Sequence, residues 1–308
     1  MDLKYKNILV TGGSGMVGKS LKKILPNATY ISSKDCDLTN ELSVSKLLTN
    51  NKYDVVIHLA AKVGGIIDNI NKPDDYLVDN IQMNTNIIKW SRLSGVERFI
   101  GILSTCIYPD KVDSYPMTEE VLHDGPPAPT NFSYGYAKRC MSVQIETSNK
   151  QYGTKYQYLI PCNLYGENDK FGENSHFIAA LLNKIIDAKN NNKDSITLFG
   201  TGKPLRQFMY SDDLAWVIYK CLENNIYENF NVATEENLSI YEMTKIALKS
   251  CDFETANILF DTTKPDGQYR KDVSINKLKT LLPTFTTLKL EDGIKLVFNK
   301  IVYDKISK

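Results

Sequence analysis

The chain has 308 residues, of which 42% are hydrophobic, and its 37 basic residues nearly balance its 36 acidic ones. This balance gives no global field that would attract nucleic acid or anionic lipid. No apolar run approaches the roughly 20 residues of a membrane span, and the polar first residues are not typical of a signal peptide. Six scattered cysteines without C-x-x-C spacing and only three histidines argue against disulfides and a zinc site. We expect a cytoplasmic protein of enzyme size without a metal.

The most informative segment is the glycine-rich stretch at residues 8–18. A short apolar run leads into glycines spaced G-x-x-G-x-x-G, and a helical pattern follows. Dinucleotide-binding folds place such a turn between a first strand and a helix whose N-terminus faces a pyrophosphate. A glycine turn alone can be purely structural. Its position at the start of an α/β pattern favours the dinucleotide.

The rest of the first half alternates between the two patterns. In chain order we predict a strand at 7–11, a helix at 15–25, strands at 29–32 and 54–60, a helix at 76–94, a strand at 98–104, a helix at 133–152 and a strand at 156–161. The continuously apolar run at 54–60 is typical of a parallel sheet covered on both faces. The fold class is therefore α/β, with a doubly wound parallel Rossmann sheet.

The second half follows a looser pattern. We predict helices at 175–190, from 213 onward, at 240–250 and at 290–300, with short strands at 196–199 and 206–210. We interpret this half as a smaller α/β substrate-binding lobe. The predicted division gives residues 1–164 plus about 210–235 to the dinucleotide-binding domain, and about 165–209 and 236–308 to the lobe.

Candidate chemistry begins with Tyr134 and Lys138, four residues apart near the start of a predicted helix. Positions i and i+4 share a helical face. A nearby ammonium would lower the pKa of Tyr134 and make the phenol a proton donor to a carbonyl. The Y-x-x-x-K pattern also occurs at Tyr30 and Tyr241, so only the position of this copy, between the predicted fourth and fifth strands, distinguishes it.

Ser104 and Cys106 end the predicted fourth strand, where ligand crevices of open α/β sheets lie. Alternate spacing points their side chains the same way if the strand continues. Cys106 taken alone could equally be a small buried apolar residue.

Together these motifs resemble the extended short-chain dehydrogenases/reductases, and most closely the GDP-L-fucose synthase family. They occur in family order from residue 8 to about 274. Besides the glycine turn they are His58-Leu-Ala-Ala-Lys62-Val-Gly-Gly65, Ser104-Thr-Cys106-Ile-Tyr-Pro109, Tyr134-x-x-x-Lys138, Pro161-Cys-Asn163-Leu-Tyr-Gly166, Asn174-Ser-His176, Gly200-Thr-Gly-Lys-Pro-Leu-Arg206 and Lys264-Pro-Asp-Gly267.

The resemblance implies a homodimeric enzyme in which NADPH reduces the C4 keto group of a GDP-4-keto-6-deoxy sugar, with C3/C5 epimerisation at the same site. It makes Tyr134 the acid that protonates the C4 oxygen, Ser104 a hydrogen-bond donor to that oxygen, and Lys138 the holder of the nicotinamide ribose. It matches Cys106 and His176 to the base and acid of epimerisation. A thiol and an imidazole can both exchange protons near neutral pH.

The resemblance also assigns the cofactor residues. They are Gly12, Ser14, Gly15, Met16, Val17, Ser33, Lys34, Asp37, Leu38, Leu59, Ala60, Ala61, Tyr134, Lys138, Pro161, Asn163, Leu164 and His176. Ser14 stands where close relatives carry an arginine that helps bind the 2′-phosphate of NADP. No acidic residue directly ends the second strand, so Ser33 and Lys34 predict a moderate preference for NADPH over NADH.

The substrate residues implied by the resemblance are Lys62, Val63, Gly64, Ser104, Cys106, Asn163, Lys184, Phe199, Gly200, Arg206, Lys264 and Asp266. Phe199 would lie near the guanine and Arg206 at the pyrophosphate, while Lys184 replaces an arginine.

Two alternative functions remain. One is a pure C4 reductase of a related GDP-4-keto sugar, such as a GDP-manno-heptose derivative, acting after a separate epimerase. The other is an idle binding regulator, against which the intact Ser104, Tyr134 and Lys138 argue.

Overall fold

The computed structural model describes residues 3, 6–171 and 175–306. Its centre is a six-stranded parallel sheet in the order β10-β5-β4-β3-β1-β2. The strands are β1 (Ile8–Thr11), β2 (Thr29–Ile31), β3 (Val55–His58), β4 (Arg98–Ile102), β5 (Lys155–Pro161) and β10 (Phe230–Val232). Every residue of β1, β3 and β4 is buried, which explains their apolar runs. The predicted doubly wound sheet is confirmed.

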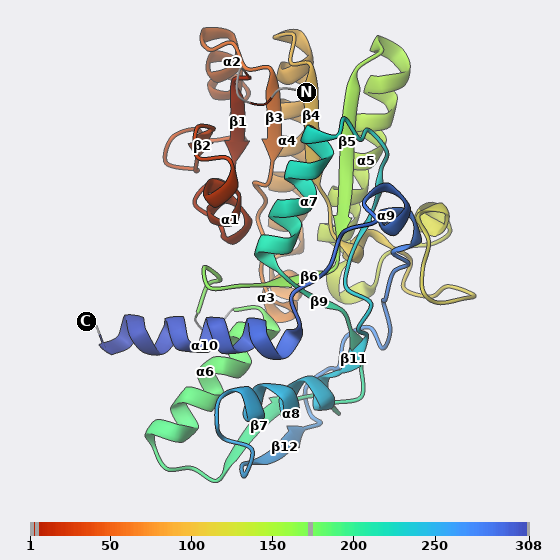
Figure 1. Cartoon of the computed structure of the whole chain (residues 1–308). Coiled ribbons are helices and arrows are strands. Elements are labelled where there is room, and N and C mark those ends of the chain that lie inside the picture. Colours follow the sequence, from red (N-terminus) through yellow and green to blue (C-terminus); the bar gives the residue numbers. More distant parts are fainter. Residues whose placement is uncertain (1–2, 4–5, 172–174, 307–308) are drawn as a thin grey trace.

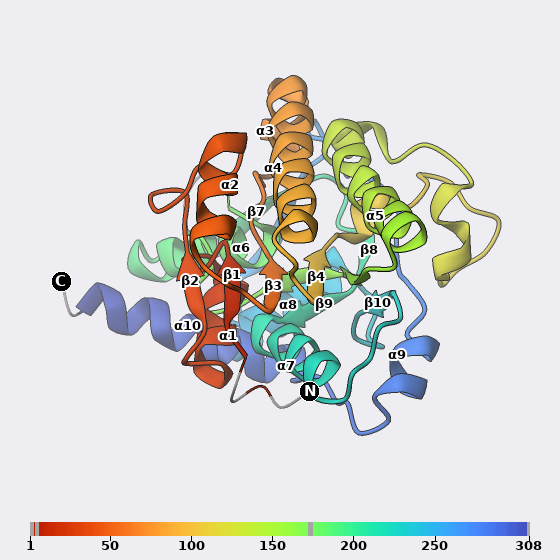
Figure 2. The ribbon, with the colours of Figure 1, turned by 90° about the horizontal axis from the view of Figure 1, so that it is seen from above.

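Helices cover both faces of the sheet. The first group, α1 (Met16–Ile24) and α7 (Ser211–Glu223), packs on one face. The second, α2 (Glu41–Asn50), α4 (Pro73–Leu93) and α5 (Phe132–Tyr152), lies on the other, as Figure 2 shows from above. Sequence analysis missed α2 and the short α3 (Ile66–Asn71). Helix α2 begins at Asn40, whose side chain accepts a hydrogen bond from the backbone N–H of Ser43.

A smaller lobe lies beyond the carboxyl ends of the sheet strands (Figure 1). Its helices are α6 (Phe177–Asn190), α8 (Ile240–Ser250) and α10 (Leu290–Ile306), and β7 (Ser195–Phe199) pairs in parallel with β12 (Asn257–Asp261). Two short ladders connect it to the sheet domain: β6 (Asn163–Tyr165) with β9 (Phe208–Tyr210), and β8 (Leu205–Arg206) with β11 (Leu238–Ser239).

Two separate hydrophobic cores accompany this division. One lies around the sheet, and the other is formed by α6, β7, α8 and α10. The segment with Val273 and Leu278, which includes α9 (Asn276–Leu281), packs into the first core although it follows the lobe helix α8 in the chain. The domain boundaries stay a prediction.

Three predicted strands end differently from expectation. The strand predicted at 98–104 stops at Ile102 and a short 3-10 helix, η2 (Thr105–Ile107), follows. The strand predicted at 54–60 stops at His58. The strand predicted at 206–210 is divided at Gln207, whose side chain bonds to the backbone of Thr234 and Val273. Further 3-10 turns are η3 (Glu119–His123) and η4 (Pro129–Asn131). No helix in the described ranges is long and apolar enough to cross a membrane.

Candidate active site

The glycine-rich turn lies at the end of β1, which pairs with β2 on one side and β3 on the other. Gly12 has a φ of +70°, and a Cβ atom on it would come within 2.8 Å of the backbone nitrogen of Ala60. The next helix, α1, has no acidic residue in its first turn. Its N-cap residue is Gly15, so no side chain occupies the N-terminal backbone N–H groups. A helix N-terminus with these features attracts phosphate. The turn therefore fits a dinucleotide pyrophosphate.

Other predicted cofactor residues surround this turn. Ser14 is exposed, whereas Met16 and Val17 at the start of α1 are half-buried. The loop after β3, with Leu59, Ala60 and Ala61, is also half-buried, and the N–H of Ala60 donates to Thr11 Oγ1 over 3.3 Å.

The turn between β2 and α2 forms the rim of a hollow of about 520 Å3 that Ser33, Lys34, Asp37 and Lys46 line among others. Asp35 turns back to accept two hydrogen bonds from Ser32, and Asp37 accepts from Thr39. These carboxylates are used within the turn, while the Lys34 side chain is exposed. Leu38, predicted to contact the cofactor, is buried. Sequence analysis missed Lys46, because α2 itself was not predicted.

A buried hydrogen-bonded chain connects the sheet to α4 and α5. Thr11 Oγ1 lies 2.8 Å from His58 Nδ1, and His58 Nε2 lies 3.0 Å from Asn84 Oδ1. Asn84 in turn donates to the carbonyl of Ala137. Burial lowers the pKa of His58 to about 3, and the charge of Lys138 adds to the effect. A neutral ring suits both contacts, since it donates to Asn84 and accepts from the Thr11 hydroxyl.

The segment after β4 carries Ser104 and Cys106 in a turn. Ser104 precedes η2 and its Oγ accepts from the backbone N–H of Cys106 over 3.3 Å. The strand ends at Ile102, so the condition on which the shared direction of the two side chains depended is not met. Arg139 holds the turn, because its guanidinium donates to the carbonyls of Ile107 and Gly125, each at 2.8 Å.

Tyr134 and Lys138 lie on α5 as predicted, but their predicted electrostatic coupling is wrong. Burial raises the pKa of Tyr134, and the nearby Cys106 and Tyr76 raise it further. Lys138 is buried and donates to the carbonyl of Ile102 over 2.8 Å. Burial lowers the pKa of Lys138 to about 7. A shared helical face therefore does not decide these pKa values, because desolvation is the main cause of both shifts.

The lobe brings two cations to Cys106. Lys271 Nζ lies 3.7 Å from Cys106 Sγ. Arg206, on β8, is close enough to influence both groups electrostatically, and burial lowers the pKa of its guanidinium. Arg206 Nη1 donates to the carbonyl of Leu205 over 2.7 Å. Sequence analysis missed Lys271, which follows the Lys264–Gly267 motif by four residues without any periodic signal.

His176 immediately precedes α6. Its Nδ1 lies 3.2 Å from Oδ1 of Asp169, a carboxylate that is 5% exposed and that sequence analysis also missed. The second carboxylate oxygen of Asp169 is buried without a hydrogen-bond partner among the described atoms. Asn174, which belongs to the same motif, lies outside the described residues.

Phe199 ends β7 and its side chain is exposed. Two lysine ammonium groups lie over its ring, Lys184 at 5.0 Å and Lys264 at 6.0 Å from the centroid. Gly200 follows with a φ of +80°, and Asp266 accepts from the backbone N–H and the hydroxyl of Thr201 at 2.6 and 2.7 Å. The fold thus gathers residues far apart in sequence around one aromatic ring.

The remaining predicted residues are placed as follows. The ammonium of Lys62 pairs with two carboxylates of α4, Asp79 at 2.7 Å and Asp75 at 3.1 Å. Val63 is exposed, and Gly64 faces the hydroxyl of a buried tyrosine. Three residues lie where β5 passes into β6, namely Pro161, Asn163 and Leu164.

Comparison with known proteins decides the family. The model of the NAD dependent epimerase/dehydratase family matches residues 8–233, a span that contains the glycine turn, Ser104, Tyr134 and Lys138. The chain belongs to this family.

A GDP-L-fucose synthase of Dictyostelium discoideum is 38% identical over 94% of this chain and 93% of its own length. A GDP-L-colitose synthase of Yersinia pseudotuberculosis is 35% identical over 93% of this chain and 95% of its own length. A solved GDP-L-fucose synthetase of Naegleria fowleri bound to NADP superposes with a TM-score of 0.87 at 33% identity, covering 98% of this chain and 96% of that one. The predicted resemblance to GDP-L-fucose synthases is confirmed.

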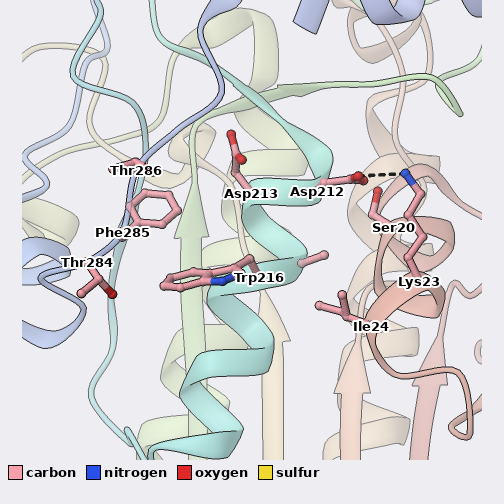
Figure 3. A pocket seen from close by; sticks show the side chains of 10 residues that line it. Ser20, Lys23, Ile24, Asp212, Asp213, Trp216, Thr284, Phe285 and Thr286 are labelled. Carbon is pink, nitrogen blue, oxygen red and sulfur yellow. Dashed lines mark hydrogen bonds and ion pairs between the residues drawn. The ribbon is translucent and has the colours of Figure 1, made fainter.

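A separate cavity of about 410 Å3 lies between α1 and α7 (Figure 3). It is lined by an aromatic side, Trp216 with Phe285, and by a polar side where Lys23 pairs with Asp212 at 2.8 Å. Burial raises the pKa of Asp213 to about 6, and its carboxylate accepts the backbone N–H of Leu288. None of the predicted site residues lines this cavity. The cavity is therefore separate from the candidate active site.

Proposed function

We propose that the protein is an NADPH-dependent reductase of the C4 keto group of a GDP-4-keto-6-deoxy sugar, and that it also epimerises C3 and C5. The main support for this proposal is that two sets of side chains lie close to Cys106. Ser104, Tyr134 and Lys138 lie at the carboxyl end of β4. Lys271 contacts the thiol of Cys106, and Arg206 is close enough to influence it electrostatically. The relatives named for GDP-L-fucose and GDP-L-colitose support a GDP-sugar substrate.

The cofactor would be held by the glycine turn and by the β2–α2 turn. Gly12, Gly15 and the N-terminus of α1 suit the pyrophosphate, and Lys34 suits a 2′-phosphate. When bound, NADPH supplies the hydride that reduces the ketone. The solved GDP-L-fucose synthetase of Naegleria fowleri, which is bound to NADP, supports this cofactor.

In the reduction, Tyr134 is the general acid. Its raised pKa keeps the phenol protonated at neutral pH, so that it can give its proton to the C4 oxygen. Ser104 donates a second hydrogen bond to that oxygen. Lys138 is fixed by the carbonyl of Ile102 and serves the ribose side.

In the epimerisation, the ketone acidifies the protons on the adjacent carbons C3 and C5. The hydrogen bonds from Tyr134 and Ser104 stabilise the enolate that forms when such a proton leaves. Cys106 removes the proton, and His176 returns one from the other side of the ring. Asp169 orients the imidazole through Nδ1, which leaves Nε2 for proton transfer.

A coupled assay tests the reductase. NADPH oxidation is followed with a panel that compares a GDP-4-keto-6-deoxy hexose with GDP-4-keto heptoses. Turnover with the hexose supports the proposal. A preference for a pre-epimerised heptose would instead indicate a pure C4 reductase of a GDP-heptose derivative. No turnover with any of these sugars would refute both functions.

A second experiment tests the epimerase. The protein is incubated in D2O with the keto sugar and NADP+, which cannot reduce it, and deuterium at C3 and C5 is measured by mass spectrometry. Incorporation that disappears in Cys106→Ser supports epimerisation. Incorporation no greater than in an enzyme-free control, together with fast reduction of a pre-epimerised sugar, would leave a pure C4 reductase.

The assembly and location belong to the same proposal. We expect a cytoplasmic homodimer, and exposed apolar side chains on α4 and α5 (Val78, Phe132 and Val143) support self-association through these helices. Light scattering of the wild type and of Val143→Glu tests this, because the charge should shift the protein to monomer.

A further inference from the structure

Lys271 is the one lysine among the described residues that hydrogen-bonds to a cysteine thiol, and sequence analysis gave it no role. Its Nζ lies 3.7 Å from Cys106 Sγ, within reach of a hydrogen bond to sulfur. Arg270 and Asp272 on either side of it pair with each other and leave Lys271 as the residue of this segment that enters the site. The contact joins positions 165 residues apart, so the fold of the lobe onto the sheet creates it.

We propose that Lys271 is the positioning residue that holds Cys106 in its thiolate form for proton abstraction from the sugar. This rests on the proposed epimerase function. Burial lowers the pKa of Lys271, and the neighbouring Cys106 opposes that shift. The ammonium of Lys271 beside the sulfur favours the thiolate form of Cys106 over the thiol.

The proton transfers balance. The S–H bond of Cys106 breaks and its proton passes to water, which leaves a thiolate beside the ammonium of Lys271. The thiolate then takes a proton from the carbon next to the ketone, and the C–H electron pair moves into the enolate. No oxidant or reductant takes part.

Other groups that face Cys106 fit this arrangement. Arg206 adds a positive charge from β8, and the protonated phenol of Tyr134 adds none. Lys271 also faces Arg206 and the buried thiol of Cys162. Among the described residues, Lys271 is the cationic side chain that hydrogen-bonds to Cys106 directly.

The test measures how fast iodoacetamide alkylates Cys106 at different pH values, by peptide mass spectrometry of the whole protein. Cys140, which is exposed on α5, is an internal control in the same sample, and Cys36, Cys162, Cys221 and Cys251 are buried. We expect Lys271→Met to raise the pH midpoint for Cys106 by about one unit or more, which is roughly tenfold slower alkylation at pH 7. Lys271→Arg should keep the wild-type midpoint, because it restores the charge.

Lys245→Met is the matched control for loss of a lysine charge, since Lys245 is exposed on α8. If Lys271→Met does not fold, Lys271→Gln takes its place. A midpoint that stays at the wild-type value in a folded variant would overturn the proposal. So would equal changes at Cys106 and Cys140, because they would report general loosening.

Alkylation needs no sugar, so it separates this inference from the proposed function. A wild type that turns over no keto sugar, with a shifted midpoint in Lys271→Met, would refute the function and leave the lysine–thiol pair intact. With the sugar, deuterium exchange at C3 and C5 should fall about tenfold more in Lys271→Met than C4 reduction does. Equal loss of both would assign Lys271 to substrate binding and overturn the proposal.

Discussion

The two halves of the candidate site are built in different ways. The sheet half holds Thr11, His58 and Asn84 buried in one hydrogen-bonded chain, and beside it Lys138 is buried with a hydrogen bond to the carbonyl of Ile102. The lobe half presents Phe199, 57% exposed, with lysine side chains lying across it. Buried networks have one low-energy arrangement, whereas exposed side chains can adjust. The chemistry would thus be fixed by the sheet, and the choice of sugar nucleotide by the lobe.

The largest effect is expected at the centre of the sheet half. Tyr134→Phe removes one hydroxyl and little surface, so we expect kcat to fall about 10²- to 10⁴-fold while NADPH binding is kept. The measurement is steady-state NADPH oxidation with the keto sugar, beside cofactor binding by fluorescence.

Tyr136→Phe is the matched control, because Tyr136 lies two residues further on the exposed side of α5. Near-normal turnover in Tyr134→Phe, or an equal loss in Tyr136→Phe, would contradict the assignment of the general acid.

The second prediction concerns the buried histidine. Its pKa of about 3 in the folded protein lies below the ordinary value of 6.5. Between these values the unfolded chain binds a proton that the folded protein does not, so His58 makes stability fall as pH falls from 6.5 towards 3. In His58→Asn, we expect the free energy of unfolding to fall by about 2–3 kcal/mol less than in the wild type between pH 7 and pH 4.5.

Urea unfolding at several pH values measures this effect. His123→Asn changes an exposed histidine and should leave the slope unaltered. If the free energy of unfolding depends on pH in the same way in the wild type and in His58→Asn, the buried His58 does not cause the loss of stability at low pH.

The third prediction moves to the lobe. Arg206→Ala should raise KM for the GDP-sugar about 10- to 100-fold, because a charge-assisted contact with a phosphate contributes about 1.5–3 kcal/mol. KM for NADPH should stay within a factor of two or so. Kinetics with each substrate varied in turn give both values.

Arg270→Ala is the matched control, since that arginine pairs with Asp272 instead. A rise in the cofactor KM alone would place the phosphate contact in the sheet half and remove the contrast between the two halves.

The smallest effect is expected at the rim of the cofactor site. Lys34→Ala should reduce the preference for NADPH over NADH by no more than about tenfold, because Lys34 is exposed and Lys46 lines the same hollow. The ratio of kcat/KM for the two cofactors measures it. Lys52→Ala removes another exposed lysine as control, and an unchanged ratio in Lys34→Ala combined with Lys46→Ala would put the 2′-phosphate elsewhere.

The sequence by itself determined five of the six strands of the central sheet, the glycine turn and the helix that carries Tyr134, but not β10. Short continuously apolar runs that alternate with helical patterns are typical of strands in a parallel sheet covered on both faces. The i, i+4 spacing likewise places Lys138 on the same helix face. Such features depend on neighbours in the chain, and periodicity reports them.

Tertiary structure alone decided the protonation and partners of the site. Lys271 beside Cys106 and Asp169 beside His176 are contacts across loops that have no period, and sequence analysis missed both. The prediction that Lys138 lowers the pKa of Tyr134 failed for the same reason. A pKa depends on how much water the whole fold removes from a group and on which carbonyl its charge meets, here that of Ile102, and no local pattern in the chain encodes either quantity.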